Sequence, residues 1–238
     1  MSTIGVISRL FLPSTCCLCG APGFEPDFDL CRVCLGLLPS TSNAPVPKLP
    51  HIRHVLVPFD YAYPIDHCVR SLKFRGERVY ARVLGTLLAK AARNSGRPLP
   101  DLLIPVPLHP VRYRARGFNQ AAEIARHAAA RLGLHIETRV LTRAVPTREQ
   151  SGLALAERRR NLRGAFRVVR TIAARRVVLV DDVLTTGSTA SEAARALNAA
   201  GVAEIELWGV ARVRLRPLFD YRPVVEAARQ SHAHHEAR

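Results

Sequence analysis

Two adjacent carboxylates and a hydroxyl-rich loop stand together in the second half of the chain. The apolar run Val177–Val180 is followed directly by Asp181 and Asp182. The loop that comes next consists of Thr185, Thr186, Gly187, Ser188 and Thr189. Ligands of open α/β sheets bind at the carboxyl ends of strands, and glycine, hydroxyls and helix N-terminal N–H groups suit a phosphate. Because neighbouring carboxylates suit ribose hydroxyls or a hydrated Mg²⁺, this stretch predicts a sugar-phosphate site.

The same stretch has a simpler interpretation. The acids would then end a solvated strand, and the loop would only cap the following helix. A cap usually needs one such residue, whereas five follow the paired acids here. We therefore favour the ligand site.

Three arginines alternate in a segment nearer the middle of the chain. They are Arg112, Arg114 and Arg116, and they follow the apolar run Leu102–Val106. Pro107 and Pro110 predict a loop here. Since guanidinium groups bind phosphates through two parallel hydrogen bonds, three of them near a strand end are expected to hold a pyrophosphate. A solvated basic loop is the alternative.

Four cysteines near the N-terminus have metal-ligand spacing. They form the pattern C-x2-C-x11-C-x2-C: Cys16, Cys19, Cys31 and Cys34. Two such pairs complete a tetrahedral Zn²⁺ site, and a segment this short needs such a link to fold. An iron–sulfur cluster is the alternative occupant. We expect Cys17 to be a bystander or an alternative ligand, and Cys68 to be a small core residue.

Positive charge is concentrated downstream of the cysteines. The formal net charge is +16, and the segment Val111–Arg176 holds 16 arginines against four glutamates, an excess of 12. Such a surface attracts the phosphates of a small ligand or of a nucleic acid. A biased, arginine-rich composition is the alternative explanation.

Nothing in the sequence predicts a membrane or export segment. No apolar run reaches the roughly 18 residues that a membrane span needs. The first residues lack the charged start, apolar run and cleavage site of a signal peptide. We therefore expect the protein in the cytoplasm, where clustered cysteines favour metal over disulfides.

Apolar periodicity predicts alternating strands and helices in the larger part of the chain. The expected strands are His54–Phe59, Leu102–Val106, Val177–Val180 and Ile205–Val213. The expected helices are Ile65–Phe74, Arg78–Ala92, Asn119–Leu132 and Thr189–Ala200. This order is typical of an α/β domain whose mostly parallel sheet is flanked by helices. We divide the chain into a cysteine module (1–38), a Pro/Ser-rich linker (39–50), the α/β domain (51–225) and a polar tail (226–238).

Two segments resemble known families. Val177–Thr189 resembles the phosphoribosyl pyrophosphate-binding motif of type I phosphoribosyltransferases. The run P-V-P-L-H-P-x-R-x-R-x-R-G-F-N-Q, which begins at Pro105, is similar to the hallmark of the ComF family of competence-associated proteins. Further segments agree with that family: the four cysteines, Leu72–Phe74, Thr147-x-x-Gln150-x-x-Leu153, Arg160–Asn161 and Gly164–Phe166.

The resemblance implies a type I phosphoribosyltransferase fold with a zinc-ribbon-like N-terminal module. Asp181 and Asp182 would face the ribose hydroxyls, Thr185–Thr189 would hold the 5′-phosphate, and the three arginines would neutralise a leaving pyrophosphate. Arg143–Leu162 would be a flexible loop that closes over the ligand. Its residues Gln150, Arg160 and Asn161 would contact the ligand, as would Lys73.

Two functions remain open at this point. The first is an enzyme that transfers a phosphoribosyl group from phosphoribosyl pyrophosphate to a nitrogen nucleophile with Mg²⁺. The second is a protein that uses the same fold to bind single-stranded DNA during uptake, together with other DNA-uptake proteins. No nucleobase-recognition segment is identifiable, so the sequence does not name an acceptor.

Overall fold

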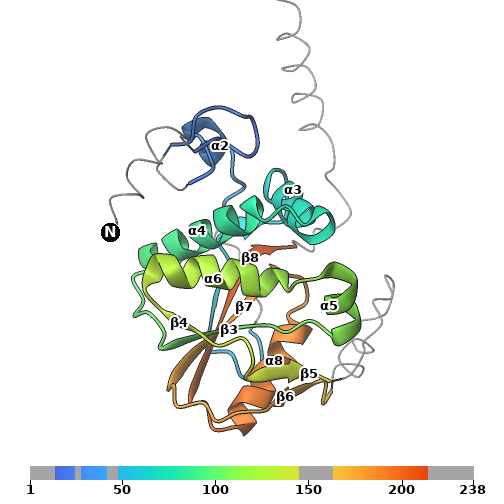
Figure 1. Cartoon of the computed structure of the whole chain (residues 1–238). Helices are drawn as coiled ribbons and strands as arrows, with labels where there is room; N and C mark the ends of the chain where they lie inside the picture. The colour runs from blue at the N-terminus through green and yellow to red at the C-terminus, as the bar shows by residue number, and fades with distance from the viewer. Residues whose placement is uncertain (1–13, 25–27, 42–47, 145–162, 214–238) are drawn as a thin grey trace, which may run out of the picture.

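A parallel sheet runs through the centre of the molecule (Figure 1). The computed structural model describes residues 14–24, 28–41, 48–144 and 163–213. The main path of the sheet has the order β1-β8-β7-β3-β4, and its neighbouring strands are parallel. These strands are β1 (His54–Leu56), β3 (Leu102–Pro105), β4 (His135–Ile136), β7 (Arg176–Leu184) and β8 (Glu204–Arg212). The predicted parallel sheet is confirmed.

The edge of the sheet next to β8 is interrupted. β1 ends at Leu56, and β2 (Phe59–Asp60) pairs with a later part of β8. Pro58 lies between them, and a proline has no N–H group for a strand ladder. The predicted strand His54–Phe59 is therefore two short pieces.

Helices cover both faces of the sheet (Figure 1). On one face lie α4 (Val79–Asn94) and α6 (Gln120–Leu132), and on the other lies α8 (Ser188–Ala199). Val178 of β7 packs with the core beneath α4, whereas Val177 packs with the core beneath α8. Because successive side chains of a strand point to opposite faces, β7 is apolar on both. Among the helices of the described ranges, none is long and apolar enough to cross a membrane.

Short elements that the sequence analysis did not predict complete the described fold. α2 (Arg32–Gly36) follows the second cysteine pair, and α5 (Pro110–Arg116) precedes α6. β5 (Leu141–Arg143) and β6 (Phe166–Val168) form a separate antiparallel pair. Elements this short carry too little periodicity to be recognised.

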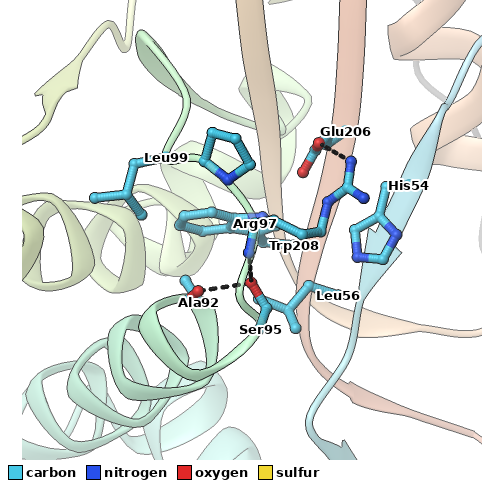
Figure 2. A pocket seen from close by; sticks show the side chains of 9 residues that line it. His54, Leu56, Ala92, Ser95, Arg97, Leu99, Glu206 and Trp208 are labelled. Atoms are coloured by element: carbon cyan, nitrogen blue, oxygen red, sulfur yellow. Dashed lines mark hydrogen bonds and ion pairs between the residues drawn. The ribbon is translucent and has the colours of Figure 1, made fainter.

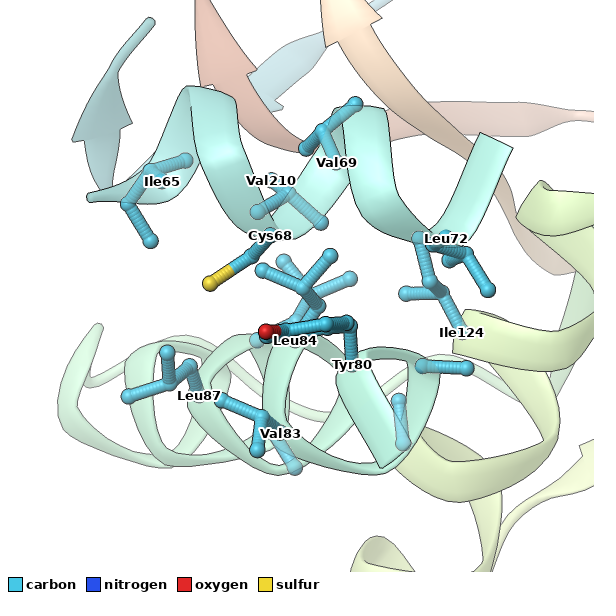
Figure 3. Packing of buried hydrophobic residues seen from close by; sticks show 14 of the residues in the cluster. Ile65, Cys68, Val69, Leu72, Tyr80, Val83, Leu84, Leu87, Ile124 and Val210 are labelled. Atoms are coloured by element: carbon cyan, nitrogen blue, oxygen red, sulfur yellow. The ribbon is translucent and has the colours of Figure 1, made fainter. Parts of the chain in front are cut away.

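A continuous helical segment follows β2. α3 (Ile65–Arg70) runs directly into a turn of π-helix, η1 (Ser71–Arg75). Its buried face packs on α4, where Cys68 and Leu72 lie near Tyr80 and Leu84 (Figure 3). The predicted helix is confirmed, and Cys68 is a core residue that is 1% exposed. Turns of π-helix are rare and occur frequently at functional sites.

Both described ends of the predicted linker contact the sheet. Ser40 forms an isolated antiparallel bridge with Phe59, and the N–H of Thr41 donates to the carbonyl of Pro58 at 2.9 Å. At the other end, Leu49 is buried in the core beneath α8. These contacts tie both described ends of the segment to the sheet.

Gly85 is a point of close approach between α4 and α6. An added Cβ would lie 2.6 Å from the carbonyl oxygen of Ile124 and 2.6 Å from Cβ of His127. Gly85→Ala therefore forces the helices apart, and we expect the free energy of unfolding to fall by about 1–3 kcal/mol in urea denaturation. Gly36→Ala is the control, because it makes the same change in a helix with open space around it. Equal stability of the two variants would contradict the packing.

Candidate functional site

The two aspartates lie inside a strand rather than beyond its end. β7 continues through both of them to Leu184, and Asp181 is paired with Gly209 of β8. The prediction that the strand ends at Val180 is wrong, because the pairing with β8 extends further. On its other side, β3 ends at Pro105, opposite Val180. The carboxylates therefore lie at the carboxyl end of β7, where its neighbour β3 has already ended.

Lys73 of η1 contacts one of these carboxylates. Its Nζ forms an ion pair with Oδ2 of Asp182, and the two side chains are 22% and 6% exposed. Oδ1 of Asp182 accepts a hydrogen bond from the N–H of Val183 at 2.9 Å. The resemblance implies a ligand contact for Lys73, and in the structure Lys73 lies at the carboxylate pair.

The charges of this cluster do not balance when both carboxylates are ionised. Burial raises the pKa of Asp181 to about 8; the charge of Asp182 adds to this effect and Lys73 opposes it. Burial alone would lower the pKa of Lys73, but the attraction of Asp182 and Asp181 outweighs it, so this pKa lies above its usual value. One ammonium group therefore serves two carboxylates. Without a ligand, the proton that Asp181 keeps near neutral pH balances the cluster. When both carboxylates are ionised, a divalent cation or the hydroxyl groups of a sugar would compensate the second charge, and carboxylate oxygens are ligands that Mg²⁺ accepts.

The loop Thr185–Thr189 presents polar groups at the start of α8. The N-cap residue is Gly187, which has no side chain to bond the N–H groups of the first turn. The first turn contains no acidic side chain, and the hydroxyls of Thr186 and Ser188 lie 2.9 Å apart. Oγ1 of Thr186 accepts a hydrogen bond from the N–H of Ser188 at 3.4 Å, so a loop hydroxyl contributes to the cap of α8. A helix N-terminus with no acidic side chain in its first turn also favours an anion, and the phosphate site stays a prediction.

Leu49 packs where a side chain at position 187 would lie. Gly187 has a φ of +73°, and an added Cβ would lie 2.4 Å from Cδ2 of Leu49. Position 187 therefore requires glycine for two reasons: its backbone is left-handed, and Leu49 fills the space that a side chain would need. Leu49 belongs to the predicted linker, more than 130 residues away, so local sequence gave no signal for its role.

The three arginines lie on a helix and not on a loop. α5 begins with Pro110, its N-cap His109 accepts the N–H of Val111 at 3.3 Å, and Gly117 ends it with a φ of +79°. Proline at the first position and glycine just after the end are typical of a short helix. The loop prediction was wrong because this signal was not recognised.

The helical geometry separates the arginines into two groups. Arg112 and Arg116 are four residues apart and share one face, whereas Arg114 points away and is exposed. Arg116 contacts the side-chain oxygen of Gln120, and its guanidinium lies 6.0 Å from the ring of Phe74 on η1. The described arrangement therefore brings two of the three arginines to one face of α5, and their contact with a pyrophosphate stays a prediction.

Several predicted ligand contacts lie outside the described residues. These are Gln150, Arg160 and Asn161, all within the expected flexible loop. The first residue of that expected loop, Arg143, is instead the last residue of β5. After the loop, the N–H of Gly164 donates to Oε1 of Glu192 at 2.7 Å, which attaches this end to α8.

Tyr61 also lies at this end of the sheet, although it was not among the predicted site residues. Its N–H donates to the carbonyl of Arg212 at 2.8 Å, directly after β2. Burial raises the pKa of Tyr61, and the nearby Lys73 opposes the shift. Its phenol is therefore a neighbour of the Lys73–Asp182 pair.

The four cysteines of the predicted metal site come together. The sulfurs of Cys16, Cys19, Cys31 and Cys34 all lie within 4.8 Å of one another. Gly20 turns the first pair with a φ of +77°, and its N–H donates to the carbonyl of Cys16 at 2.9 Å. This cluster fits the four-thiolate coordination of Zn²⁺.

The adjacent thiols of Cys16 and Cys17 differ in pKa. Burial tends to raise the pKa of Cys16, but hydrogen bonds from backbone N–H groups, including that of Cys31, lower it to about 7. Burial raises the pKa of Cys17 to about 12, and Cys17 is not part of the four-sulfur cluster. The bystander interpretation of Cys17 fits this arrangement.

The cysteine module is attached to α4. The guanidinium of Arg82 bonds both carboxylate oxygens of Asp29, at 2.6 and 2.8 Å. The hydroxyl of Tyr80 donates to the carbonyl of Cys17 at 3.2 Å. Cysteines of the module and apolar residues of α4 belong to one buried cluster, so no solvent layer separates the module from the sheet domain.

A small pocket lies at the other end of the sheet (Figure 2). His54, the first residue of β1, lines it together with Trp208 and Arg97, and Arg97 pairs with Glu206 at 2.9 Å. Burial, followed by the charge of Arg97, lowers the pKa of His54. Since parallel sheets bind ligands at the carboxyl ends of their strands, we assign no function to this pocket.

Comparisons with known proteins find one matching family and several relatives. Residues 114–233 match the family described as phosphoribosyl transferase domain. The DNA utilization protein YhgH of Salmonella typhi is 34% identical over 224 residues, which cover 85% of this chain and 99% of that protein. Competence protein F of Haemophilus influenzae is 37% identical over 64% of this chain and 69% of its own length. A glutamine phosphoribosylpyrophosphate amidotransferase from B. subtilis is 21% identical, covering 63% of this chain and 32% of that one, with a TM-score of 0.37.

The raised pKa of Asp181 predicts a pH-dependent stability. A carboxyl whose pKa is higher in the folded state stabilises the fold below its unfolded pKa, and this contribution is lost as the pH rises through the folded pKa. For Asp181 the window runs from the ordinary value of 3.8 to about 8. We therefore expect the free energy of unfolding, measured in urea without Mg²⁺, to fall more from pH 5 to pH 8 in the native protein than in Asp181→Asn.

The comparison between variants removes the contributions of other titrating groups. Glu137→Gln, at a half-buried position outside this cluster, should keep the pH slope of the native protein. If Asp181→Asn has that same slope, the carboxylate is not perturbed as described.

Proposed function

Because the chain belongs to the family of competence protein F and the DNA utilization protein YhgH, with a phosphoribosyl transferase domain, we propose that it binds phosphoribosyl pyrophosphate or a closely related sugar phosphate. The ligand lies at the carboxyl end of β7. The relatives' names refer to DNA utilization and competence, so we place the activity in the uptake of DNA or the metabolism of its nucleotides.

One observation carries this proposal. The carboxylates of Asp181 and Asp182 directly precede a loop whose hydroxyls and helix N-terminus favour an anion. A surface that meets only the phosphates of DNA gains nothing from two partly uncompensated carboxylates. A sugar phosphate uses both halves of the site, since its hydroxyls donate to the carboxylates and its phosphate accepts from the loop.

The reaction that fits this site is phosphoribosyl transfer. The bond from C1 of the ribose to pyrophosphate breaks, a bond from C1 to a nitrogen nucleophile forms, and pyrophosphate leaves with the bonding electrons. When bound, Mg²⁺ would supply positive charge to the pyrophosphate. The protein contributes position and charge: Asp181 and Asp182 hold the sugar, Thr185–Thr189 hold the 5′-phosphate, and Arg112 or Arg116 faces the leaving group.

A second candidate function is the binding of single-stranded DNA without a reaction. The observation that favours it is the excess of arginine on the phosphoribosyl transferase part of the chain. The two functions make different demands on Asp181 and Asp182, which a sugar phosphate needs and a DNA backbone does not. Replacement of Asp181 and Asp182 therefore distinguishes the two functions.

The N-terminal cluster holds a structural Zn²⁺ in this proposal. Four thiolates leave no open position for a substrate, so the metal does not take part in the reaction. Its role is to fold the segment that carries Asp29 and so to complete the contact with Arg82 of α4.

Calorimetric titration with phosphoribosyl pyrophosphate and Mg²⁺ tests the sugar-phosphate site. We expect binding by the native protein and binding weaker by on the order of 100-fold in the Asp181→Asn, Asp182→Asn double variant, because two charged hydrogen-bond acceptors are lost. Glu204→Gln, at the amino end of β8, is the matched control and should bind normally. No binding by the folded native protein would remove the proposal, and binding of a single-stranded oligonucleotide by all three proteins would leave the second function.

Replacement of single cysteines tests the metal site. Cys16→Ser should reduce the zinc content from about one ion per chain to almost none, and should lower the thermal stability of the module. Cys17→Ser removes a neighbouring thiol that lies outside the cluster and should keep its zinc. Elemental analysis of both purified variants decides the assignment, which fails if Cys16→Ser keeps a full equivalent of zinc.

A further inference from the structure

The outward face of α3 and η1 forms an open groove that the sugar-phosphate site does not use. Its volume is about 390 Å³ and its lining comes from residues 63–75. This volume falls in the usual range of small-molecule sites, roughly 300–1,000 Å³. The groove lies on the face opposite the buried residues Cys68 and Leu72, which already pack on α4.

Two aromatic rings are exposed in this groove. Tyr63 is 69% exposed and Phe74 is 75% exposed, and both belong to the lining. Neither ring is needed to fill the core, because the other face of the helical segment does so. Exposed aromatic rings in a basic setting are platforms on which nucleic-acid bases stack.

Cationic groups lie between and beside the rings. Arg70 and Arg75 are both exposed and both line the groove. Arg75 contacts Ser71 and pairs with Glu77 at 2.7 Å, and Arg116 of α5 lies 6.0 Å from the Phe74 ring. Guanidinium groups bind phosphates through paired hydrogen bonds.

The lining also contains groups that suit the edge of a base. Asp66 and His67 are half-buried and line the groove; Nε2 of His67 bonds the hydroxyl of the buried Tyr80 at 3.2 Å, so of these two groups the Asp66 carboxylate is the one available to a ligand. The carboxylate of Asp66 accepts the N–H of His67 at 2.7 Å, which orients it. Stacking rings, guanidinium groups and edge-reading polar groups thus occur together in one concave surface.

We propose that this groove is a nucleotide-binding site, in which Tyr63 or Phe74 stacks on the base and Arg70 and Arg75 bind the phosphate. The nucleotide is either a free monophosphate or a unit of a single strand, since both present the same base and phosphate. The lining of this groove includes neither Asp181 and Asp182 nor the loop Thr185–Thr189, so either proposal can fail alone.

The π-helical turn η1 contributes residues to both sites. η1 directs Lys73 inward to Asp182, while Phe74 and Arg75, the next residues, line the outer groove. A nucleotide in the groove would therefore lie against the same helical turn that holds the carboxylate pair. Binding in the groove does not require Asp181 or Asp182.

Replacements at Phe74 test the stacking directly. Calorimetry with thymidine 5′-monophosphate and fluorescence anisotropy with a labelled twelve-residue oligothymidylate are both measured without phosphoribosyl pyrophosphate or Mg²⁺. We expect Phe74→Leu to weaken the binding about tenfold and Phe74→Trp to keep it within about twofold, because tryptophan stacks and leucine does not. Since Phe74 is exposed, both variants should fold, which circular dichroism checks.

A replacement of charge tests the phosphate contact. Arg70→Ala should weaken the binding and reduce its dependence on salt. Arg170→Ala removes the same charge from an exposed position outside the groove and should have little effect. If both variants lose the same binding affinity, the effect comes from net charge alone and the proposed phosphate contact is wrong.

The two probes also distinguish the source of the nucleotide. Binding of the monophosphate and of the oligonucleotide, both sensitive to Phe74→Leu, supports a site for nucleotides in either form, and sensitivity with the oligonucleotide alone supports a site for single strands. Binding that ribose 5-phosphate displaces and that ignores Phe74→Leu belongs to the loop Thr185–Thr189 and overturns the proposal. The proposal is also overturned if neither the monophosphate nor the oligonucleotide binds.

Discussion

The hydrogen bonding of β7 to a parallel neighbour on each side is the constraint from which the rest of the described structure follows. A strand in this position has both faces buried, which explains its apolar sequence and requires helices above and below the sheet. It also places Asp181, Asp182 and the loop after them at one end of the sheet. The candidate site is thus a consequence of the way in which the core is built.

Electrostatics at this end of the sheet gives the site its chemical preference. One buried lysine meets two carboxyl groups, and the raised pKa of Asp181 reflects the cost of ionising both of them. A few residues later, the start of α8 has the opposite preference, for an anion. A ligand with hydroxyl groups at one end and a phosphate at the other satisfies both, which neither an inorganic phosphate nor an uncharged sugar does.

The features that depend on neighbouring residues in the chain could be predicted from the sequence. The long periodic segments, the parallel sheet and the four-cysteine cluster were all foreseeable, because apolar period and metal-ligand spacing are properties of neighbouring residues. The extension of β7 past Val180 depends on pairing with β8, and the roles of Leu49 and Tyr61 depend on contacts with distant parts of the chain. The helix α5 differs from these, since Pro110 and Gly117 signalled it and the alternating arginines drew attention away from that signal.

The shared core between the cysteine module and α4 has an evolutionary consequence. A module that folds alone can be duplicated, lost or joined to other genes, because its removal exposes little apolar surface. Here Cys16 and Phe28 are buried in the same cluster as Val83 and Leu87, so a recombination event between them would expose apolar surface on both products.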